Sequence, residues 1–156
     1  MTLAVAEADA PDADVDASLR FREATENDRP FILDSWLKSY RKGSPEARVV
    51  HGLIYYAGQS EMAQTLLKRS HTLLACDAEH PDEIWAWLCF EVLPTRAAVI
   101  HYAYTKSALR RFGLQARLLK VVRGLAPGAA FHTHQTDVGA LVGAKYGSTF
   151  NPYLAR

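Results

Sequence analysis

The 156-residue chain is short of cysteine, of long apolar runs and, in its first part, of positive charge. Its two cysteines, Cys76 and Cys89, are too few for a disulfide framework and are not spaced as metal ligands, which predicts reduced core residues in a cytoplasmic protein. No apolar run approaches the ~20 residues of a membrane-spanning helix, and the N-terminus lacks the positive region and apolar stretch of a signal peptide. We therefore expect neither a membrane partner nor a leader.

The first 17 residues contain five acidic residues but no lysine, arginine or aromatic residue. Such a composition buries little apolar surface, so we predict a disordered acidic tail over residues 1–17 and one folded domain over residues 18–156. Without the tail, the remaining 12 acidic and 18 basic residues give the domain a charge of about +6. This charge suits an anionic ligand such as a nucleotide cofactor, and it is too mild and scattered to indicate nucleic-acid binding.

Hydrophobic spacing predicts a mixture of helices and strands in the folded part. This order indicates a single α/β (α+β) domain with helices packed on a sheet. We read the aromatic stretch 49–60 as irregular, and Pro152 confines the last strand to an edge of the sheet. The predicted elements are strand 19–24, helix 28–41, helix 61–69, strands 71–76, 84–92 and 97–105, helix 111–123, strand 130–134, helix 137–146 and strand 148–154.

The segment from Ile100 to Leu119 carries the sharpest local signal in the chain. A strand ends, a basic turn with one glycine follows, and a helix opens. A helix start presents unpaired N–H groups and the positive end of the helix dipole, so it readily binds phosphate. Gly113 removes a Cβ where a ligand would approach, and Arg110 and Arg111 add positive charge. On the residues alone, a phosphate site and a tight turn with solvated arginines are equally open.

Over residues 19–154 the order of elements resembles that of the GNAT superfamily of acyl-CoA N-acyltransferases. In that family a strand runs into a loop of the form Arg/Gln-x-x-Gly-x-Gly/Ala, whose amides hold the CoA pyrophosphate. Arg110-x-x-Gly113-x-Gln115 fits this pattern except at Gln115, where Gly or Ala is usual. The resemblance implies a central mixed, mostly antiparallel sheet flanked by helices, with acetyl-CoA as acyl donor and no metal. By the same resemblance the cofactor-binding residues are Tyr104, Thr105, Lys106, Arg110, Arg111, Phe112, Gly113, Leu114 and Gln115.

Two short runs, 35–41 and 151–154, also resemble small GNAT-like proteins encoded by bacteriophages. This suggests a second interpretation, in which the fold has lost catalysis and serves as a binding or structural module.

Acyl transfer to an amine needs a polarised thioester carbonyl, an acid for the leaving thiolate and a base for the amine. The resemblance assigns the first to a backbone amide between Tyr102 and Thr105. It assigns the second to a tyrosine in the last helix, a position that Gly143 occupies when Lys145-Tyr146-Gly147 is aligned with the family's ending. Tyr146 lies one helical turn further on and is our candidate for the acid. Thr136 matches an asparagine that often precedes this helix.

The candidates for the base are Glu91 and His101, which lie on adjacent predicted strands, and His132 and His134, which alternate on the next. Histidine can accept a proton near neutral pH without help. Strand alternation predicts that His101 shares one face of its strand with Val99 and Ala103, and that Tyr102 and Tyr104 lie on the opposite face. With no cysteine or carboxylate near His132 and His134, we expect no metal site there.

The acceptor amine is of unknown type, and we expect it to enter through the first helix pair and residues 49–60. The aromatic residues Trp36, Tyr40, Tyr55 and Tyr56 either line that side or pack in the core. The edge strand near the C-terminus leaves pairing into a homo-oligomer open.

Overall fold

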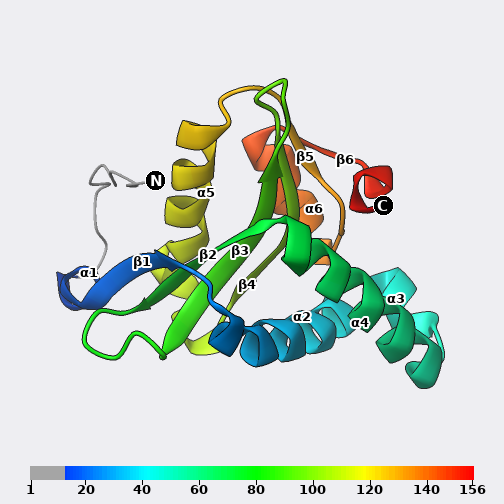
Figure 1. Ribbon diagram of the computed structural model, residues 1–156, viewed down its shortest axis with the longest axis horizontal. Helices are drawn as coiled ribbons and strands as arrows, with labels where there is room; N and C mark the ends of the chain where they lie inside the picture. The colour runs from blue at the N-terminus through cyan, green and yellow to red at the C-terminus, as the bar shows by residue number, and fades with distance from the viewer. Residues whose placement is uncertain (1–12) are drawn as a thin grey trace.

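The computed structural model describes residues 13–156 of the chain, and residues 1–12 lie outside the described part. Six strands form one sheet whose order, β1-β2-β3-β4-β5-β6, follows the chain (Figure 1). Neighbours from β1 to β4 are antiparallel, and β4–β5 and β5–β6 are parallel. The predicted single domain with a mixed, mostly antiparallel sheet is confirmed. The strands are β1 (Leu19–Glu23), β2 (His71–Asp77), β3 (Ile84–Val92), β4 (Ala98–Thr105), β5 (Ala130–His132) and β6 (Ser148–Phe150).

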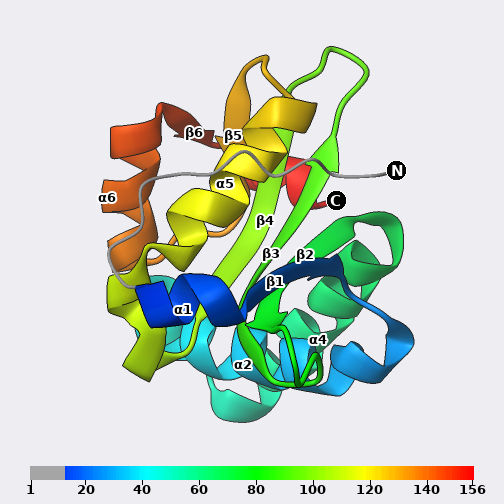
Figure 2. The same ribbon diagram turned by 90° about the vertical axis from the view of Figure 1, so that its left-hand side faces the viewer.

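Helices cover the sheet on both sides. The long helices α2 and α4 lie below it in Figure 1, whereas α5 packs on the opposite face and stands in front of the strands in Figure 2. Within residues 13–156, no helix has the length and apolar character needed to cross a membrane. The helices are α1 (Ala13–Ser18), η1 (Glu26–Asp28), α2 (Arg29–Gly43), α3 (Pro45–Val49), α4 (Gly52–Arg69), η2 (Ser107–Phe112), α5 (Leu114–Leu125), α6 (Asp137–Tyr146) and η3 (Pro152–Ala155), the η elements being 3-10 turns.

Two apolar cores follow from the two layers of helix. The α5 core joins Leu114, Leu118 and Val122, spaced along one side of that helix, to side chains of β2, β3 and β4. The second core joins α2 and α4 to the other face of the sheet through Trp36, Leu66 and their neighbours. Because β3 is buried on both faces, its sequence is an almost unbroken apolar run.

Local signals explain where several elements begin and end. At the start of α2, Pro30 occupies the first turn and Asp28 accepts hydrogen bonds from the backbone and side chain of Thr25. At the start of α6, the side chain of Thr136 accepts a hydrogen bond from Gly139 N. That helix ends at Gly147, which has a φ of 68°.

Several predicted boundaries were wrong, among them the end of the predicted strand 130–134, which stops at residue 132. Residues 13–17, assigned to the tail, form most of α1, which packs Val15 on the α5 core; the rest of the predicted tail lies outside the described residues. Residues 52–60 of the stretch read as irregular belong to α4, and Leu53 and Ile54 on its exposed side obscured the helical spacing. The third long helix begins at residue 114 rather than 111 because a 3-10 turn precedes it, and the last strand stops at residue 150 before Pro152.

Candidate active site

A β-bulge in β4 sets the shape of the candidate site. Cys89 pairs with Tyr102 and Phe90 pairs with Ile100, so His101 is an extra residue in the strand. A bulge bends the strand and changes which side its residues face. Ile100 packs on the α5 core, whereas Tyr102 and Tyr104 pack on the opposite core. The alternation predicted for this strand was therefore wrong at the bulge, because Ile100 and Tyr102 do not share a face.

Beyond the bulge, β4 and β5 separate. Their parallel pairing ends at Ile100 and His132, after which Thr133 N donates one more hydrogen bond to Ile100 O at 3.1 Å. β4 then continues to Thr105 with β3 as its partner. Because hydrogen-bonded and non-hydrogen-bonded pairs alternate, and Lys106 N donates to Trp85 O, the backbone groups of Ala103 and Thr105 point away from β3. This open edge can pair with an extended ligand that carries amides.

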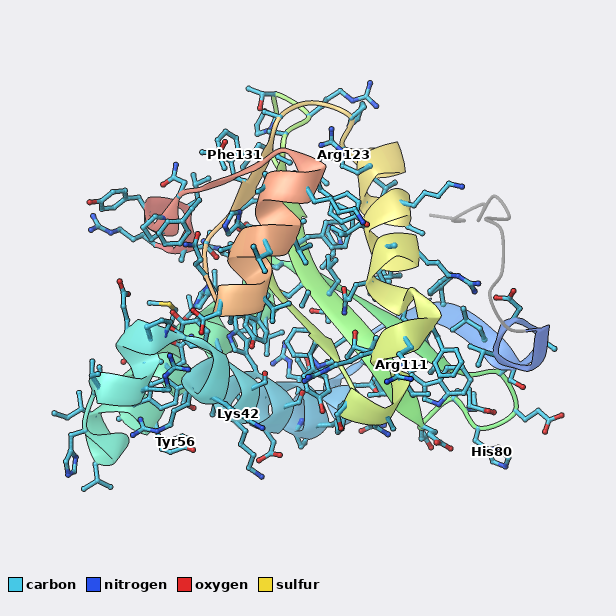
Figure 3. The ribbon with its side chains drawn as sticks, turned by 180° about the vertical axis from the view of Figure 1, so that it is seen from behind. Lys42, Tyr56, His80, Arg111, Arg123 and Phe131 are labelled. Carbon is cyan, nitrogen blue, oxygen red and sulfur yellow. The ribbon has the colours of Figure 1, made fainter. Side chains whose placement is uncertain are left out.

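The open edge leads directly to the start of α5. After η2, Gly113 adopts a φ of 66°, which glycine tolerates best, and the helix begins at the next residue. Arg110 and Arg111 are exposed and form no ion pair with any residue in the described range 13–156. In Figure 3, Arg111 lies by the first turn of α5 and Arg123 by its last. The structure thus combines free cations, a glycine turn and unpaired helix N–H groups.

The other predicted cofactor-binding side chains have different roles. Leu114 is buried in the α5 core and Phe112 packs against it, so only the backbones of these residues reach the helix start. Lys106 holds its ammonium 5.5 Å from the ring centre of Phe31, on the α2 side of the sheet. Arg117, which sequence reasoning did not single out, pairs with Asp16 of α1. The cationic part of the predicted site therefore narrows to Arg110 and Arg111.

Gln115 turns its side chain toward the strands rather than over the helix start. Its Nε2 donates to Tyr104 O at 2.8 Å, to Thr105 Oγ1 at 3.1 Å and to Trp87 O at 3.2 Å. The departure from Gly or Ala at this position therefore ties α5 to the end of β4. Its Oε1 is buried and has no hydrogen-bond partner among the described residues, which costs about 1–3 kcal/mol unless a donor is supplied.

Glu91 and His101, the two predicted candidates for the base, are brought together by the bulge. The Nε2 of His101 lies 2.6 Å from Glu91 Oε2, and its Nδ1 lies 3.0 Å from Thr133 Oγ1. His101 is 1% exposed. Burial lowers the pKa of His101 and outweighs the opposing effect of Glu91, so the ring is neutral near pH 7.

The remaining catalytic candidate, Tyr146, does not lie at the open edge of β4. It lies at the end of α6, two residues before Ser148, which is level in the sheet with Ala130 and with Ala98 at the start of β4. The open edge is at the other end of β4. Nor does position 143 leave room for a tyrosine, because a Cβ on Gly143 would lie 2.9 Å from His132 Cε1. The described part of the chain thus places no tyrosine of α6 at the open edge.

The predicted aromatic cluster divides into two groups. Trp36 is fully buried and stacks on Tyr102 with ring centres 5.2 Å apart, so it belongs to the core. Tyr40 and Tyr55 instead line a hollow of about 230 Å³ between α2, α3 and α4, together with Glu46 and Gln59. Tyr56 is half exposed beside it.

No family model and no curated protein matches this chain. Its fold matches solved structures of proteins that are named as acetyltransferases. The fold is that of the GNAT acyltransferases. A predicted acetyltransferase from Clostridium acetobutylicum, solved with acetyl-CoA, has a TM-score of 0.58 at 14% identity, covering 83% of this chain and 88% of that one. A GCN5-related N-acetyltransferase from Kribbella flavida has a TM-score of 0.53 at 18% identity, covering 72% and 67%.

A ribosomal-protein-alanine N-acetyltransferase from Brucella melitensis has a TM-score of 0.55 at 14% identity, covering 82% of this chain and 89% of that one. At these identities the likeness concerns the GNAT fold alone. The three structures come from cellular organisms, so they lend no support to the resemblance to bacteriophage proteins.

Proposed function

We propose that this protein is an acyl-CoA-dependent N-acyltransferase, most simply one that transfers acetyl from acetyl-CoA to an amine. The observation that carries the proposal is the open β4 edge running into the start of α5. Coenzyme A has an extended arm that carries amides, and this arm ends in a pyrophosphate. The amides would pair with the open edge of β4, and the pyrophosphate would bind at the start of α5. The fold shared with acetyltransferases supports it.

The residues present fit coenzyme A. Ala103 and Thr105 would hold the pantetheine amides on the β4 edge, and Oε1 of Gln115, which has no partner among the described residues, would accept a hydrogen bond from a donor of the cofactor. The N–H groups at the start of α5, with Arg110 and Arg111, would hold the pyrophosphate. Acetyl-CoA supplies an acyl group activated as a thioester.

Glu91 and His101 supply a base for the incoming amine. Phe90 packs on the α5 core, so Glu91, the next residue along β3, faces the other side of the sheet, where Arg69 of α4 contacts it and His101 pairs with it. The acceptor then approaches through the helices of that face, where Tyr40 and Tyr55 line an open hollow.

A second function, ligand binding without turnover, is favoured by Gly143. The ring of His132 fills the space beside Gly143, so residue 143 of α6 has no room for an acidic side chain that could protonate the leaving thiolate. A protein of this kind would bind acetyl-CoA and acylate no amine, so binding and turnover have to be measured separately.

Titration calorimetry and thermal melting with acetyl-CoA test the site. We expect heat of binding and a higher melting temperature, because a ligand at 100 times its Kd stabilises the native state by about 2.7 kcal/mol. Arg110→Glu and Arg111→Glu should each weaken binding about 10-fold or more by reversing charge at the helix start. Lys120→Glu makes the same charge change at an exposed position further along α5 and should leave Kd nearly unchanged.

Two results would contradict the proposal. No heat and no melting shift at millimolar acetyl-CoA would exclude a CoA-dependent enzyme. Binding that survives both arginine changes would place the cofactor elsewhere on the molecule. Release of free CoA during incubation with small amines and peptides then separates the enzyme from the binding protein.

A further inference from the structure

Five polar side chains from four segments of the chain form one continuous line of hydrogen bonds. From Glu91 on β3 it passes to His101 on β4 at 2.6 Å and to Thr133 Oγ1 after β5 at 3.0 Å. Thr133 Oγ1 lies 3.0 Å from His134 Nδ1, and His134 Nε2 lies 2.9 Å from Gln59 Nε2 on α4. We call this line, Glu91–His101–Thr133–His134–Gln59, the relay.

One arrangement of protons satisfies every member of the relay. The amide nitrogen of Gln59 can only donate, so His134 Nε2 accepts from it and His134 Nδ1–H donates to Thr133. The Thr133 hydroxyl then donates to His101 Nδ1, and His101 Nε2–H donates to the carboxylate of Glu91. Both histidines are neutral in this arrangement, and all donors point toward Glu91. A line of this kind can move a proton in one direction by successive transfers.

The middle of the relay is sealed and its two ends are open. His101, Thr133 and His134 are between 1% and 9% exposed. At one end Glu91 is 24% exposed, and Arg69 Nε lies 3.4 Å from the same oxygen that accepts from His101. At the other end Gln59 lines the hollow between α2, α3 and α4. The relay therefore joins that hollow to the surface at Glu91.

The groups around the relay favour a neutral interior. His134 is enclosed by the rings of Trp36, Tyr40 and Tyr102, with ring centres 5.1 to 6.3 Å away. Burial lowers the pKa of His134 to about 4, and the nearby His101 adds to this. Around His101 the charged neighbours are Glu91 and Arg69.

We propose that the relay carries the proton released by an acceptor amine from His134, which contacts Gln59 and Tyr40 of the hollow, to Glu91 at the surface. This rests on the proposed acyl transfer. The side chain of Gln59 releases its hydrogen bond to His134 Nε2. The amine N–H bond then breaks as the His134 Nε2–H bond forms. His134 Nδ1 passes its proton to Thr133 Oγ1, whose own proton goes to His101 Nδ1. His101 Nε2–H passes to the Glu91 carboxylate, from which solvent takes the proton.

In this scheme His134 touches the reacting amine, and Thr133, His101 and Glu91 act through it. Arg69 Nε contacts the same carboxylate oxygen of Glu91 that receives the proton from His101. The acceptor is therefore an amine small enough, at its reacting end, to enter a hollow of about 230 Å³ lined by Tyr40, Tyr55 and Glu46.

The first test is structural and needs no activity. Nitrogen-15 NMR of the whole chain distinguishes the two neutral forms of each histidine. We expect His134 with its proton on Nδ1 and His101 with its proton on Nε2. Thr133→Val should change these spectra by removing the hydroxyl, Thr133→Ser should restore them, and Thr149→Val, at an exposed position on β6, should leave them as they are.

The second test is kinetic. With an amine that the protein acylates, Thr133→Val should lower kcat by about 10²-fold and shift the pH profile, because general-base catalysis is typically worth that much. Thr133→Ser should recover most of the rate, which loss of packing alone would not predict. Glu91→Gln, at the half-open end, should reproduce the loss and serves in place of Thr133→Val if the valine variant does not fold.

The outcomes are distinct. The relay is overturned if the NMR spectra show His101 or His134 with its proton on the other ring nitrogen. It is also overturned if the rate and pH profile are unchanged in Thr133→Val, or in Glu91→Gln where that variant replaces it. Both results leave the proposed function intact. If acetyl-CoA binds but no amine is acylated, the proposed function fails and the spectra alone decide the relay. In that case the relay is supported if the expected proton positions on His101 and His134 are lost in Thr133→Val and restored in Thr133→Ser. Any other pattern overturns the relay.

Discussion

At the residue scale, Gly143 is the position where this chain departs most from its resemblance to acyltransferases. A Cβ there would lie 2.9 Å from Cε1 of His132. That ring is fixed by contacts to Ser148 Oγ at 2.8 Å and to Gln135 Oε1 at 3.2 Å. The absence of a side chain at residue 143 is therefore part of the packing between α6 and β5.

We predict that Gly143→Ala and Gly124→Ala change stability in opposite directions. Alanine normally stabilises a helix interior by about 0.5–1 kcal/mol over glycine, and Gly124 of α5 has open space for the new Cβ. At Gly143 the displaced His132 would lose its partners, and we expect a net loss of about 1–2 kcal/mol. Urea unfolding of both variants measures the difference, and equal stabilisation would show that His132 moves freely.

Single residues also show how far the site could be predicted from the sequence. Gly113 and the arginines before it were identified because a helix start after a basic glycine turn has a local pattern. Glu91 and His101 followed from strand adjacency. Thr133 and Gln59 were not identified, because nothing in the sequence pairs Gln59 with a histidine 75 residues away. That contact depends on how α4 lies against the end of β5.

At the element scale, strands and the longer helices were largely predictable, because their periods are short and local. The bulge in β4 was not, since an extra residue leaves no mark in an apolar run. The first half of α4 was also missed because its exposed side carries Leu53 and Ile54. The first error concerns strand pairing, which local preference does not determine, and the second concerns apolar residues that stay exposed.

The start of α2 gives a prediction at this scale. Asp28 is 6% exposed and accepts two hydrogen bonds from Arg22, at 2.7 and 2.8 Å. Asp28→Asn should destabilise the protein by about 3 kcal/mol, because it leaves the partly buried guanidinium without its partner. Asp34→Asn breaks an exposed pair with Lys38 and should cost less than about 0.5 kcal/mol. Similar losses in chemical unfolding would contradict this view.

The same pair has a pH dependence of known sign. Hydrogen bonds from Arg22 hold the pKa of Asp28 below its ordinary value of 3.8. The stabilisation is thus complete above pH 3.8 and is lost as the pH falls through the lowered pKa. Asp28→Asn should flatten the stability curve in that range.

At the scale of the whole molecule, the buried histidines make the fold sensitive to mild acid. The pKa of His134 falls from 6.5 in the unfolded chain to about 4 in the native state, mainly because of burial. Between these values the unfolded chain binds more protons, so stability is complete above pH 6.5 and is lost as the pH falls toward 4. The loss is on the order of 3 kcal/mol for this residue, and burial of His101 acts in the same direction.

Melting temperatures measured between pH 7 and pH 4 test this prediction. His134→Gln removes the titrating ring and should make the curve flatter over that range. His80→Gln, at an exposed position, removes a histidine without a burial effect and should leave the curve unchanged. A wild-type melting temperature that stays constant down to pH 4 would contradict a neutral buried relay.

The order of the sheet has a consequence for how the protein is made. Because each strand pairs with the one before it in the chain, β1 to β4 can assemble by antiparallel pairing once about 105 residues have left the ribosome. β5 and β6 join last, through three parallel pairs each. A nascent chain therefore has its helix start and open strand before Thr133 and His134 exist. A chain that ends after α5 contains the helix start that suits an anionic ligand, but it lacks the two residues that complete the relay.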